Sequence, residues 1–265
     1  MAKVVKKKSV LKYILNCLPS RDMENDWRVA NAEAAGLLMA APIPPSKDLR
    51  ESWWKIGNQA VTGSCVGWAV ADSVLRWHFV KAGRLAPADR CSVRYIWMAS
   101  KETDDFVSRP TTFIERDGTS IKTALDIARK FGVVPESILP FDPGILYQGE
   151  ENTFYAIAAQ RRIASYINLD TNLAKWREWI ALKGPIVTRI DVDVTWDDAT
   201  QTKGKLDRYK PNTARGGHAI ALVGYTPDRF IVRNSWGTSW GDRGFAYASD
   251  QYAGAGFTEA YGVVL

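Results

Sequence analysis

The spacing of apolar residues changes half-way along this chain, and the change restricts the folds that it can form. From 64 to 79, apolar residues recur at steps of three and four, which is the spacing of one helix face. They are Val66, Ala69, Val70, Val74 and Trp77. Two further helices are predicted at 93–102 and 119–132. Thr119 and Gly132 supply the start and stop signals of the second helix, so this part of the chain is predicted to be mainly helical.

The second part of the chain is rich in β-forming residues. One helix is predicted at 171–184, and the runs around it are separated by Gly, Pro and Asp. Strands are predicted at 162–169, 185–194, 218–226, 229–236 and 244–249. Helices followed by strands indicate an α+β fold of two lobes, with a cleft where the lobes meet.

The length and composition allow a substantial core. The chain has 265 residues, 46% of them hydrophobic, which fits one large domain or two lobes packed as a unit. We expect a leader at 1–42 and a body at 43–265, divided into a mainly helical lobe at about 43–160 and a mainly β lobe at about 161–265.

The leader itself carries too many large apolar groups for a freely solvated tail. They are Leu11, Tyr13, Ile14, Leu15, Leu18, Trp27, Leu37, Leu38 and Met39. We therefore expect the segment 10–42 to pack on the body. It could cross or border the cleft and restrain activity, or it could cover the back of a lobe and only stabilise it.

Charge and cysteine content restrict the partners and the compartment. The net charge is +6, and four lysines in the first eight residues account for most of it, since 6 − 4 = 2. We expect no nucleic-acid partner from so short a basic run. No apolar run approaches the roughly 18 residues of a membrane span.

The cysteine content bears on the compartment. The chain has three cysteines, which are Cys17, Cys65 and Cys91, and it lacks a signal-cleavage site. Both features favour a cytoplasmic protein without disulfides. Secretion by a signal-independent route is the alternative.

Cys65 lies in an unusual setting, in the stretch NQAVTGSCVGWAV at 58–70. It opens a predicted helix, where free backbone N–H groups and the helix dipole favour thiolate over thiol. Gly63 and Ser64 precede it, let the backbone approach closely and leave the sulfur accessible, so both are candidate site-lining residues. A lone cysteine at such a position is, however, more often a small buried hydrophobe.

A nucleophilic thiol usually needs an imidazole partner, and the chain has two histidines. His78 lies thirteen residues along the same helix, roughly 20 Å from Cys65, so it is expected at the helix surface or between the lobes. His218 begins a predicted strand. Asn234 follows on the next predicted strand, where its amide oxygen would orient the imidazole.

The segments NQAVTGSCVGWA, GGHAIALVGY and RNSWGTSWGDRGF resemble the papain-like cysteine peptidases, particularly bacterial members. The resemblance covers about 45–261 and implies a helical lobe and an antiparallel β-rich lobe with a cleft between them. It implies that Cys65 is the nucleophile and His218 the general base and acid, with Asn234 orienting the imidazole. Gln59 would donate to the oxyanion beside the Cys65 backbone N–H, and Trp236 would shield the bond between Asn234 and His218.

The implied activity is hydrolysis of peptide or amide bonds in a peptide or protein substrate through an acyl-enzyme, without a metal or organic cofactor. Family members commonly carry a long helical prosegment through the cleft, and the leader could serve as an intramolecular inhibitor in its place. Two alternatives use the same fold: an acyltransferase or deamidase with the same residues, and a catalytically quiet binding protein.

Several positions depart from the family pattern. Thr62 stands where a disulfide-forming cysteine is usual, and Val66 follows the nucleophile where tryptophan is usual. The Gly-Gly wall of the substrate cleft has no clear match, although 116–120 could take its place. Gly217 implies a roomy second subsite. The acidic run at 191–198 lacks the spaced ligand loop of a calcium site.

Overall fold

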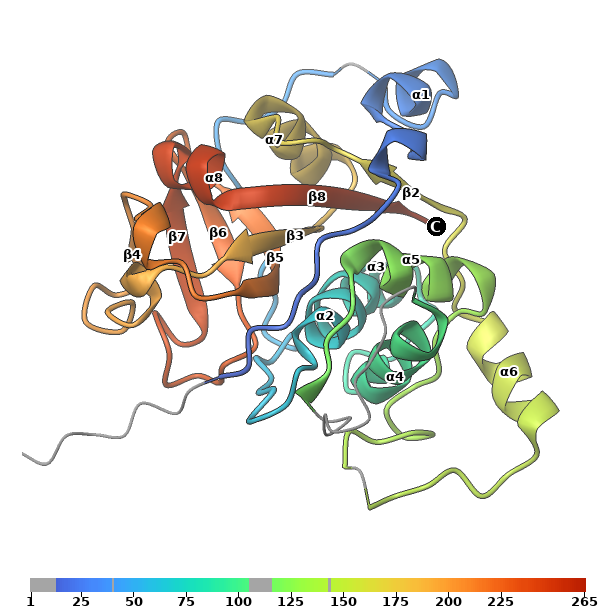
Figure 1. Cartoon of the computed structure of the whole chain (residues 1–265). Helices are drawn as coiled ribbons and strands as arrows, with labels where there is room; N and C mark the ends of the chain where they lie inside the picture. Colours follow the sequence, from blue (N-terminus) through green and yellow to red (C-terminus); the bar gives the residue numbers. More distant parts are fainter. Residues whose placement is uncertain (1–12, 40, 105–115, 143) are drawn as a thin grey trace, which may run out of the picture.

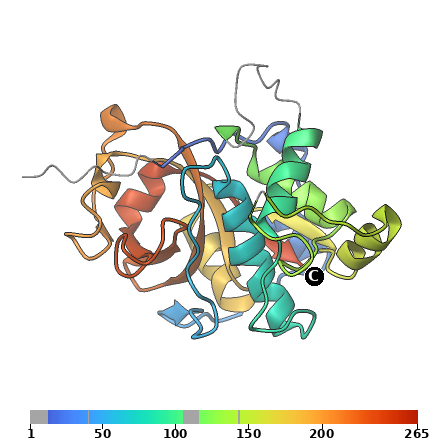
Figure 2. The ribbon, with the colours of Figure 1, turned by 90° about the horizontal axis from the view of Figure 1, so that it is seen from below.

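A computed structural model describes residues 13–39, 41–104, 116–142 and 144–265 (Figure 1). Leu11 of the leader lies outside the described residues. Helices gather on one side of the molecule and a twisted sheet forms the other, as Figures 1 and 2 show from two directions. The expected α+β fold is confirmed.

The sheet contains eight strands within the described residues. Its order is β2 (Ser165–Asn168), β8 (Phe257–Val264), β3 (Ile186–Asp191), β5 (Gly217–Tyr225), β6 (Arg229–Arg233), β7 (Phe245–Ser249) and β4 (Lys205–Leu206), and β1 (Lys47–Asp48) also pairs with β5. The pairings are antiparallel except for the parallel pair of β4 and β7. The sequence did not predict β8, which lies between β2 and β3. The predicted strand at 229–236 ends at Arg233, so Asn234 lies just beyond β6.

Helices cover both faces of the sheet. The longest continuous helical stretch described runs from Cys65 to Lys81 as α2 (Cys65–Gly67), the π-helical stretch η2 (Trp68–Leu75) and α3 (Arg76–Lys81). The other elements are η1 (Met23–Asn25), α1 (Val29–Ala34), α4 (Val93–Thr103), α5 (Ile121–Lys130), α6 (Glu151–Ala159), α7 (Leu173–Leu182), η4 (Val194–Trp196), η5 (Pro211–Thr213) and α8 (Asp250–Gly256). None of the helices in the described part of the chain is long and apolar enough to cross a bilayer.

The ends of α5 follow from local chemistry. Its cap is Ser120, whose side chain accepts the backbone N–H of Thr123, and not Thr119 as the sequence suggested. The Thr119 hydroxyl instead donates to Asp104. Gly132 ends the helix at φ +91°, where a Cβ would also lie 2.0 Å from the carbonyl oxygen of Ala158. Glycine is therefore required at this turn.

Strand β5 separates the two hydrophobic cores. All nine of its residues are buried, and their side chains alternate between the faces of the sheet. Ala219, Ala221 and Val223 face the core shared with α2, η2, α4 and α5. Ile220 and Leu222 face the core shared with α7 and α8. His218 is thus fixed at the start of a strand that is held on both sides.

A buried ion cluster joins the helical side to the sheet. Asp72 on η2 binds Arg233 of β6 with a 2.7 Å contact and Arg76 of the same helix with a 3.1 Å contact. All three side chains are at most 3% exposed. Buried charges are tolerated when they are paired in this way, and the pairing fixes the long helix against β6.

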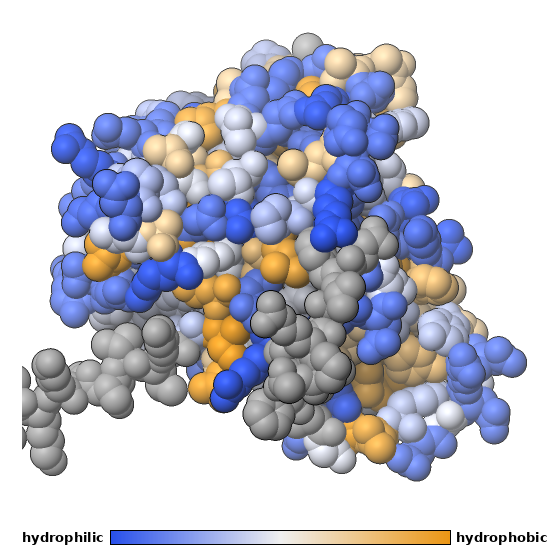
Figure 3. All heavy atoms as spheres, viewed as in Figure 1, coloured by the Kyte–Doolittle hydropathy of each residue, from blue (hydrophilic) through white to orange (hydrophobic). Residues whose placement is uncertain are grey.

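The leader passes between the two sides as an extended segment, seen in dark blue in Figure 1. The backbone N–H of Cys17 donates to Gly217 O over 2.9 Å, and that of Leu18 donates to Thr119 O over 3.1 Å. The following part, with η1 and α1, packs on the sheet side, where Val29, Ala32 and Leu38 are buried with the core of α7. In the same view, Figure 3 shows residues of apolar type gathered in the middle of the molecule, within a largely hydrophilic surface. The leader therefore packs on the body, as its apolar content predicted.

Candidate active site

Cys65 begins the long helix and is completely buried. Burial raises the pKa of its thiol, while the backbone N–H groups of Ala219, Asn16 and the helix start at Cys65 and Val66 lower it in part. Ala219 directly follows His218, so the sulfur lies against the start of β5. Asn16 belongs to the leader, so the leader passes next to the sulfur.

The imidazole of His218 is oriented by Asn234. Its Nε2 lies 2.8 Å from Asn234 Oδ1, and the same oxygen accepts the backbone N–H of Ser235 over 2.8 Å. Because this amide oxygen only accepts, Nε2 carries the proton and Nδ1 is left as the base. Nδ1 is buried and has no hydrogen-bond partner among the described residues. Burial lowers the pKa of His218 to about 4, although the bond to Asn234 raises it in part.

Gln59 is fixed so that its NH₂ group faces the leader. Its Oε1 accepts the Ser235 hydroxyl over 3.1 Å and the Trp236 indole N–H over 3.2 Å. Its Nε2 donates to Thr62 O over 3.0 Å and to Ile14 O over 3.1 Å. A donor predicted for an oxyanion therefore binds a leader carbonyl in this structure.

Trp236 packs against the ring of His218. The two ring centroids lie 4.9 Å apart with a tilt of 33°, and Trp236 is only 4% exposed. Tyr13 of the leader stacks on Trp236 at 4.6 Å and donates its hydroxyl to Trp236 O over 2.9 Å. Trp236 therefore lies over the His218 ring, and its role as a shield of the bond between Asn234 and His218 stays a prediction.

The predicted glycines allow close backbone approach. A Cβ at Gly217 would lie 2.0 Å from Cys17 O, and a Cβ at Gly118 would lie 1.7 Å from Asn16 O. A Cβ at Gly63 would lie 2.6 Å from the carbonyl oxygens of Arg116 and Asp117. Gly63 thus lets the segment at 116–120 approach the helix start, and both this segment and Gly217 contact the leader.

The other candidate residues that the sequence singled out are buried. Ser64 is buried, and its hydroxyl lies 2.6 Å from that of Thr62, which also donates to Gln59 O over 2.6 Å. His78 is buried on α3, and burial lowers its pKa to about 4, offset in part by a backbone hydrogen bond with Pro185. Cys17, Cys65 and Cys91 are free, as the sequence predicted. All three are buried, however, so the expectation of an accessible Cys65 sulfur was wrong, because the leader and the start of β5 pack against it.

The sequence did not predict two groups of contacts near His218. Trp196 packs edge-on against the His218 ring at 5.7 Å. The leader contacts run mostly through backbone atoms of Ile14, Asn16 and Cys17, so residue type gives little signal for them. A tryptophan within the acidic run that follows a buried strand is a sequence signal for Trp196.

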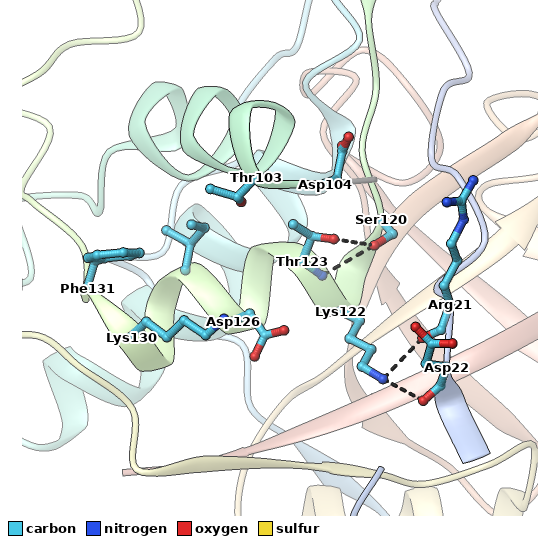
Figure 4. A pocket seen from close by; sticks show the side chains of 11 residues that line it. Arg21, Asp22, Thr103, Asp104, Ser120, Lys122, Thr123, Asp126, Lys130 and Phe131 are labelled. Atoms are coloured by element: carbon cyan, nitrogen blue, oxygen red, sulfur yellow. Dashed lines mark hydrogen bonds between the residues drawn. The ribbon is translucent and has the colours of Figure 1, made fainter. Parts of the chain in front are cut away.

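A separate hollow of about 280 Å³ lies between the leader and α5 (Figure 4). Lys122 points across it and donates to the carbonyl oxygens of Arg21 and Asp22 over 3.1 and 2.7 Å. Asp126 and Lys130 also line it. The hollow contains none of the predicted catalytic residues, and its contacts fasten the leader to the helical side.

The comparison with family models decides the identity of the chain. A model described as papain family cysteine protease matches residues 43–261. The chain belongs to the papain family. Mouse cathepsin J is 26% identical over 219 residues, which cover 77% of this chain and 59% of the cathepsin. Mouse cathepsin K is 26% identical over 238 residues, or 86% of this chain and 64% of the cathepsin. The chain thus spans about 60% of the length of these papain-family relatives.

Solved structures of papain-family proteins share the fold. Xylellain, a cysteine protease from Xylella fastidiosa, superimposes with a TM-score of 0.78 at 20% identity, covering 97% of this chain and 98% of its own. Procathepsin B from Trypanosoma congolense gives a TM-score of 0.70 at 15% identity, covering 94% of this chain and 86% of its own. The expected papain-like fold is therefore confirmed.

Proposed function

We propose that this papain-family chain hydrolyses peptide bonds with Cys65 as nucleophile and His218 as general base and acid. The observation that carries the proposal is the orientation of the imidazole. Asn234 Oδ1 accepts a hydrogen bond from the Nε2–H of His218, which leaves a buried lone pair on Nδ1. The next residue of the strand, Ala219, contacts the Cys65 sulfur through its backbone N–H. Nucleophilic catalysis needs an oriented imidazole with a free nitrogen near the thiol, and the orientation of His218 and the contact between Ala219 and Cys65 support that arrangement.

The proposed reaction has two halves. His218 Nδ1 takes the thiol proton, and the Cys65 sulfur attacks the carbonyl carbon of the substrate. The resulting oxyanion receives hydrogen bonds from Gln59 Nε2 and the Cys65 backbone N–H. His218 then protonates the leaving amine as the C–N bond breaks. In the second half, Nδ1 takes a proton from water and the hydroxide attacks the acyl carbon. The C–S bond then breaks, the carboxylic acid product leaves, and the Cys65 thiolate takes the proton back from Nδ1.

The leader is proposed to hold this site at rest, as an intramolecular inhibitor. Ile14 O occupies the Gln59 donor, and the Asn16 N–H occupies the Cys65 sulfur. Burial raises the pKa of the thiol and lowers that of the imidazole, so both groups are neutral at pH 7 while the leader is in place. Displacing the leader admits water and favours the thiolate and imidazolium pair.

The division of the chain follows the same proposal. The leader is assigned to 1–42 and the peptidase domain to 43–265, with lobes at about 43–160 and 161–265. The helices α2 to α6 lie between Cys65 and Ala159, and the strands β2 to β8 lie between Ser165 and Val264, which supports the two lobes. A cytoplasmic location is also proposed, supported by three free buried cysteines.

Cleavage profiling with a diverse peptide library tests the activity. The parent chain is expected to cleave peptides, and Cys65→Ala is expected to abolish cleavage while the protein stays folded. Parallel reactions with added amines distinguish hydrolysis from acyl transfer, since a transferase would form the amide product. Equal cleavage by the parent and Cys65→Ala, or no cleavage by either with or without the leader, would contradict the proposal.

A further inference from the structure

The acidic run at 191–198 contains a buried carboxylate that the proposed reaction does not use. Asp193 follows β3 and is completely buried. Its Oδ1 accepts the hydroxyls of Thr195 over 2.5 Å and of Tyr252 over 2.7 Å, and its Oδ2 accepts the backbone N–H of Lys210 over 2.7 Å. These donors occupy both oxygens, so the carboxylate is held in a single orientation.

The hydrogen bonds continue from Asp193 to Trp196. The Trp196 indole N–H donates to the Tyr252 hydroxyl over 2.9 Å, and Tyr252 in turn donates to Asp193. Burial raises the pKa of Tyr252 far above its usual value, so its hydroxyl keeps the proton that it donates. Trp196 and Tyr252 are both fully buried, in η4 and α8 respectively. The chain of bonds thus fixes the orientation of the indole.

Trp196 in turn contacts the catalytic histidine. Its ring lies 5.7 Å from that of His218 at an interplanar angle of 89°, and Trp236 lies on the imidazole at 4.9 Å. Trp196 also stacks on Trp240 at 4.9 Å and accepts its indole N–H at the backbone oxygen. A single hydrogen bond from Nε2 to Asn234 leaves the imidazole free to tilt about that bond, and the two indoles oppose that tilt.

We propose that Trp196 is a positioning residue for His218, and that Asp193, through Tyr252, fixes the indole that aims the imidazole at Cys65. The inference rests on the proposed function, because a fixed orientation of the imidazole is needed only if Nδ1 exchanges protons with the Cys65 sulfur. A small displacement of the imidazole is expected to slow such a proton transfer, since misplacing reacting groups by about 1 Å can lower the rate by about 10²-fold.

The test uses the full chain and two conservative substitutions. Tyr252→Phe removes the hydroxyl and keeps the ring, and Trp196→Phe removes the indole N–H and part of the contact. Trp176→Phe is the matched control. Trp176 is also fully buried in the β-rich lobe and also donates its indole N–H, to Asp170 O over 3.0 Å. It packs on Phe230 and Phe257.

Histidine NMR supplies a readout that does not depend on activity. The chain has only two histidines, so a protein labelled at histidine gives two imidazole signals, and His78→Gln assigns them. In Tyr252→Phe and Trp196→Phe we expect the His218 ring signals and their titration to shift while those of His78 stay in place. With a peptide substrate, kcat should fall by about tenfold to 10²-fold, with KM changed less than about twofold.

The control separates positioning from packing. Trp176→Phe is expected to lower the melting temperature and to leave kcat and the His218 signals at parent values. The inference is overturned if Tyr252→Phe and Trp196→Phe lower only the melting temperature, or if Trp176→Phe shifts the His218 signals equally. If the parent shows no peptidase activity either with or without residues 1–22, while its His218 signals still respond to Tyr252→Phe, the proposed function is refuted and the positioning contact stands.

Discussion

At the level of single residues, burial keeps the thiol of Cys65 and the imidazole of His218 neutral while the leader is in place. A helix start alone suggested a thiolate at Cys65. The structure differs because a completely buried sulfur loses the solvation of its charge, and the surrounding backbone N–H groups offset only part of that loss. The reactive state therefore depends on access of solvent as well as on the identity of the residues.

Gln59 gives the sharpest prediction at this scale. Removing its NH₂ group in Gln59→Ala should lower kcat by about 10²- to 10³-fold, because one oxyanion donor is lost. KM should change little, since the donor acts mainly on the charge that develops during the reaction. Steady-state kinetics on a cleaved peptide measure both constants. Gln148→Ala, at an exposed glutamine, is the control, and an effect of Gln59→Ala confined to KM would contradict the role.

The two buried histidines predict how stability changes with pH. Burial lowers the pKa of His78 and His218 to about 4, so the unfolded chain binds protons more readily between about pH 6.5 and 4. Their contribution is fully present above about pH 6.5 and is lost as the pH falls toward 4, by up to about 1.4 kcal/mol per pH unit and histidine.

Denaturant unfolding of the parent and of His78→Leu at a series of pH values measures this contribution. The difference between the two proteins isolates His78 from the carboxyl groups, which titrate in the same range. The free energy of unfolding of His78→Leu should fall less steeply on acidification. Identical slopes for both proteins would show that His78 does not carry the expected proton linkage.

At the level of elements, the leader has two parts with different contacts. Residues 13–22 run as extended chain past Cys65, Gly217 and Thr119. Beyond them, Asp26 joins the leader to three body residues: its carboxylate contacts Lys122 over 2.7 Å, Tyr261 over 2.9 Å and Asn168 over 3.0 Å. The first segment therefore passes over the candidate site, and the second packs on the body. The two alternatives given for the leader, restraint at the cleft and stabilisation of a lobe, are thus compatible.

Two deletions separate these tasks by thermal melting. Removing residues 1–22 should lower the melting temperature only slightly, because most of the apolar groups of the leader that enter the sheet-side core lie beyond residue 22. Removing residues 1–40 should lower it clearly, since Val29, Ala32 and Leu38 then leave that core and expose their former partners. An equal loss of melting temperature in both deletions would assign the stabilising role to the first segment instead.

At the level of the whole molecule, local patterns predicted much of the fold and the candidate site. Helix periodicity located the helix that begins at Cys65. His218 lies in a short motif on β5, and Asn234 lies in a second short motif just after the neighbouring strand β6. The sequence did not predict strand β8 because Gly262 interrupts its apolar run and Thr258 and Glu259 lie within it. Such a strand is recognised only by its pairing with β2 and β3.

The path of the leader could not be predicted for a different reason. Its contacts with Gly217 and Thr119 are backbone hydrogen bonds, which almost any residue type can make. The buried chain from Asp193 to Trp196 depends on Tyr252, which lies 59 residues further along the sequence. Contacts of this kind follow from the folded arrangement of the elements and leave no local pattern.

The central claim is that Cys65 and His218 form a reactive pair which the leader covers. The rate of Cys65 alkylation at about pH 5.5, followed by mass spectrometry, tests it most directly in the full chain, in a chain lacking residues 1–22, and in that shorter chain with His218→Ala. At this pH a thiol with an ordinary pKa near 8.5 is almost entirely protonated and reacts slowly. The account predicts slow alkylation in the full chain, fast alkylation after removal of 1–22, and a return to slow alkylation when His218 is also replaced. Equal rates in all three proteins would contradict it.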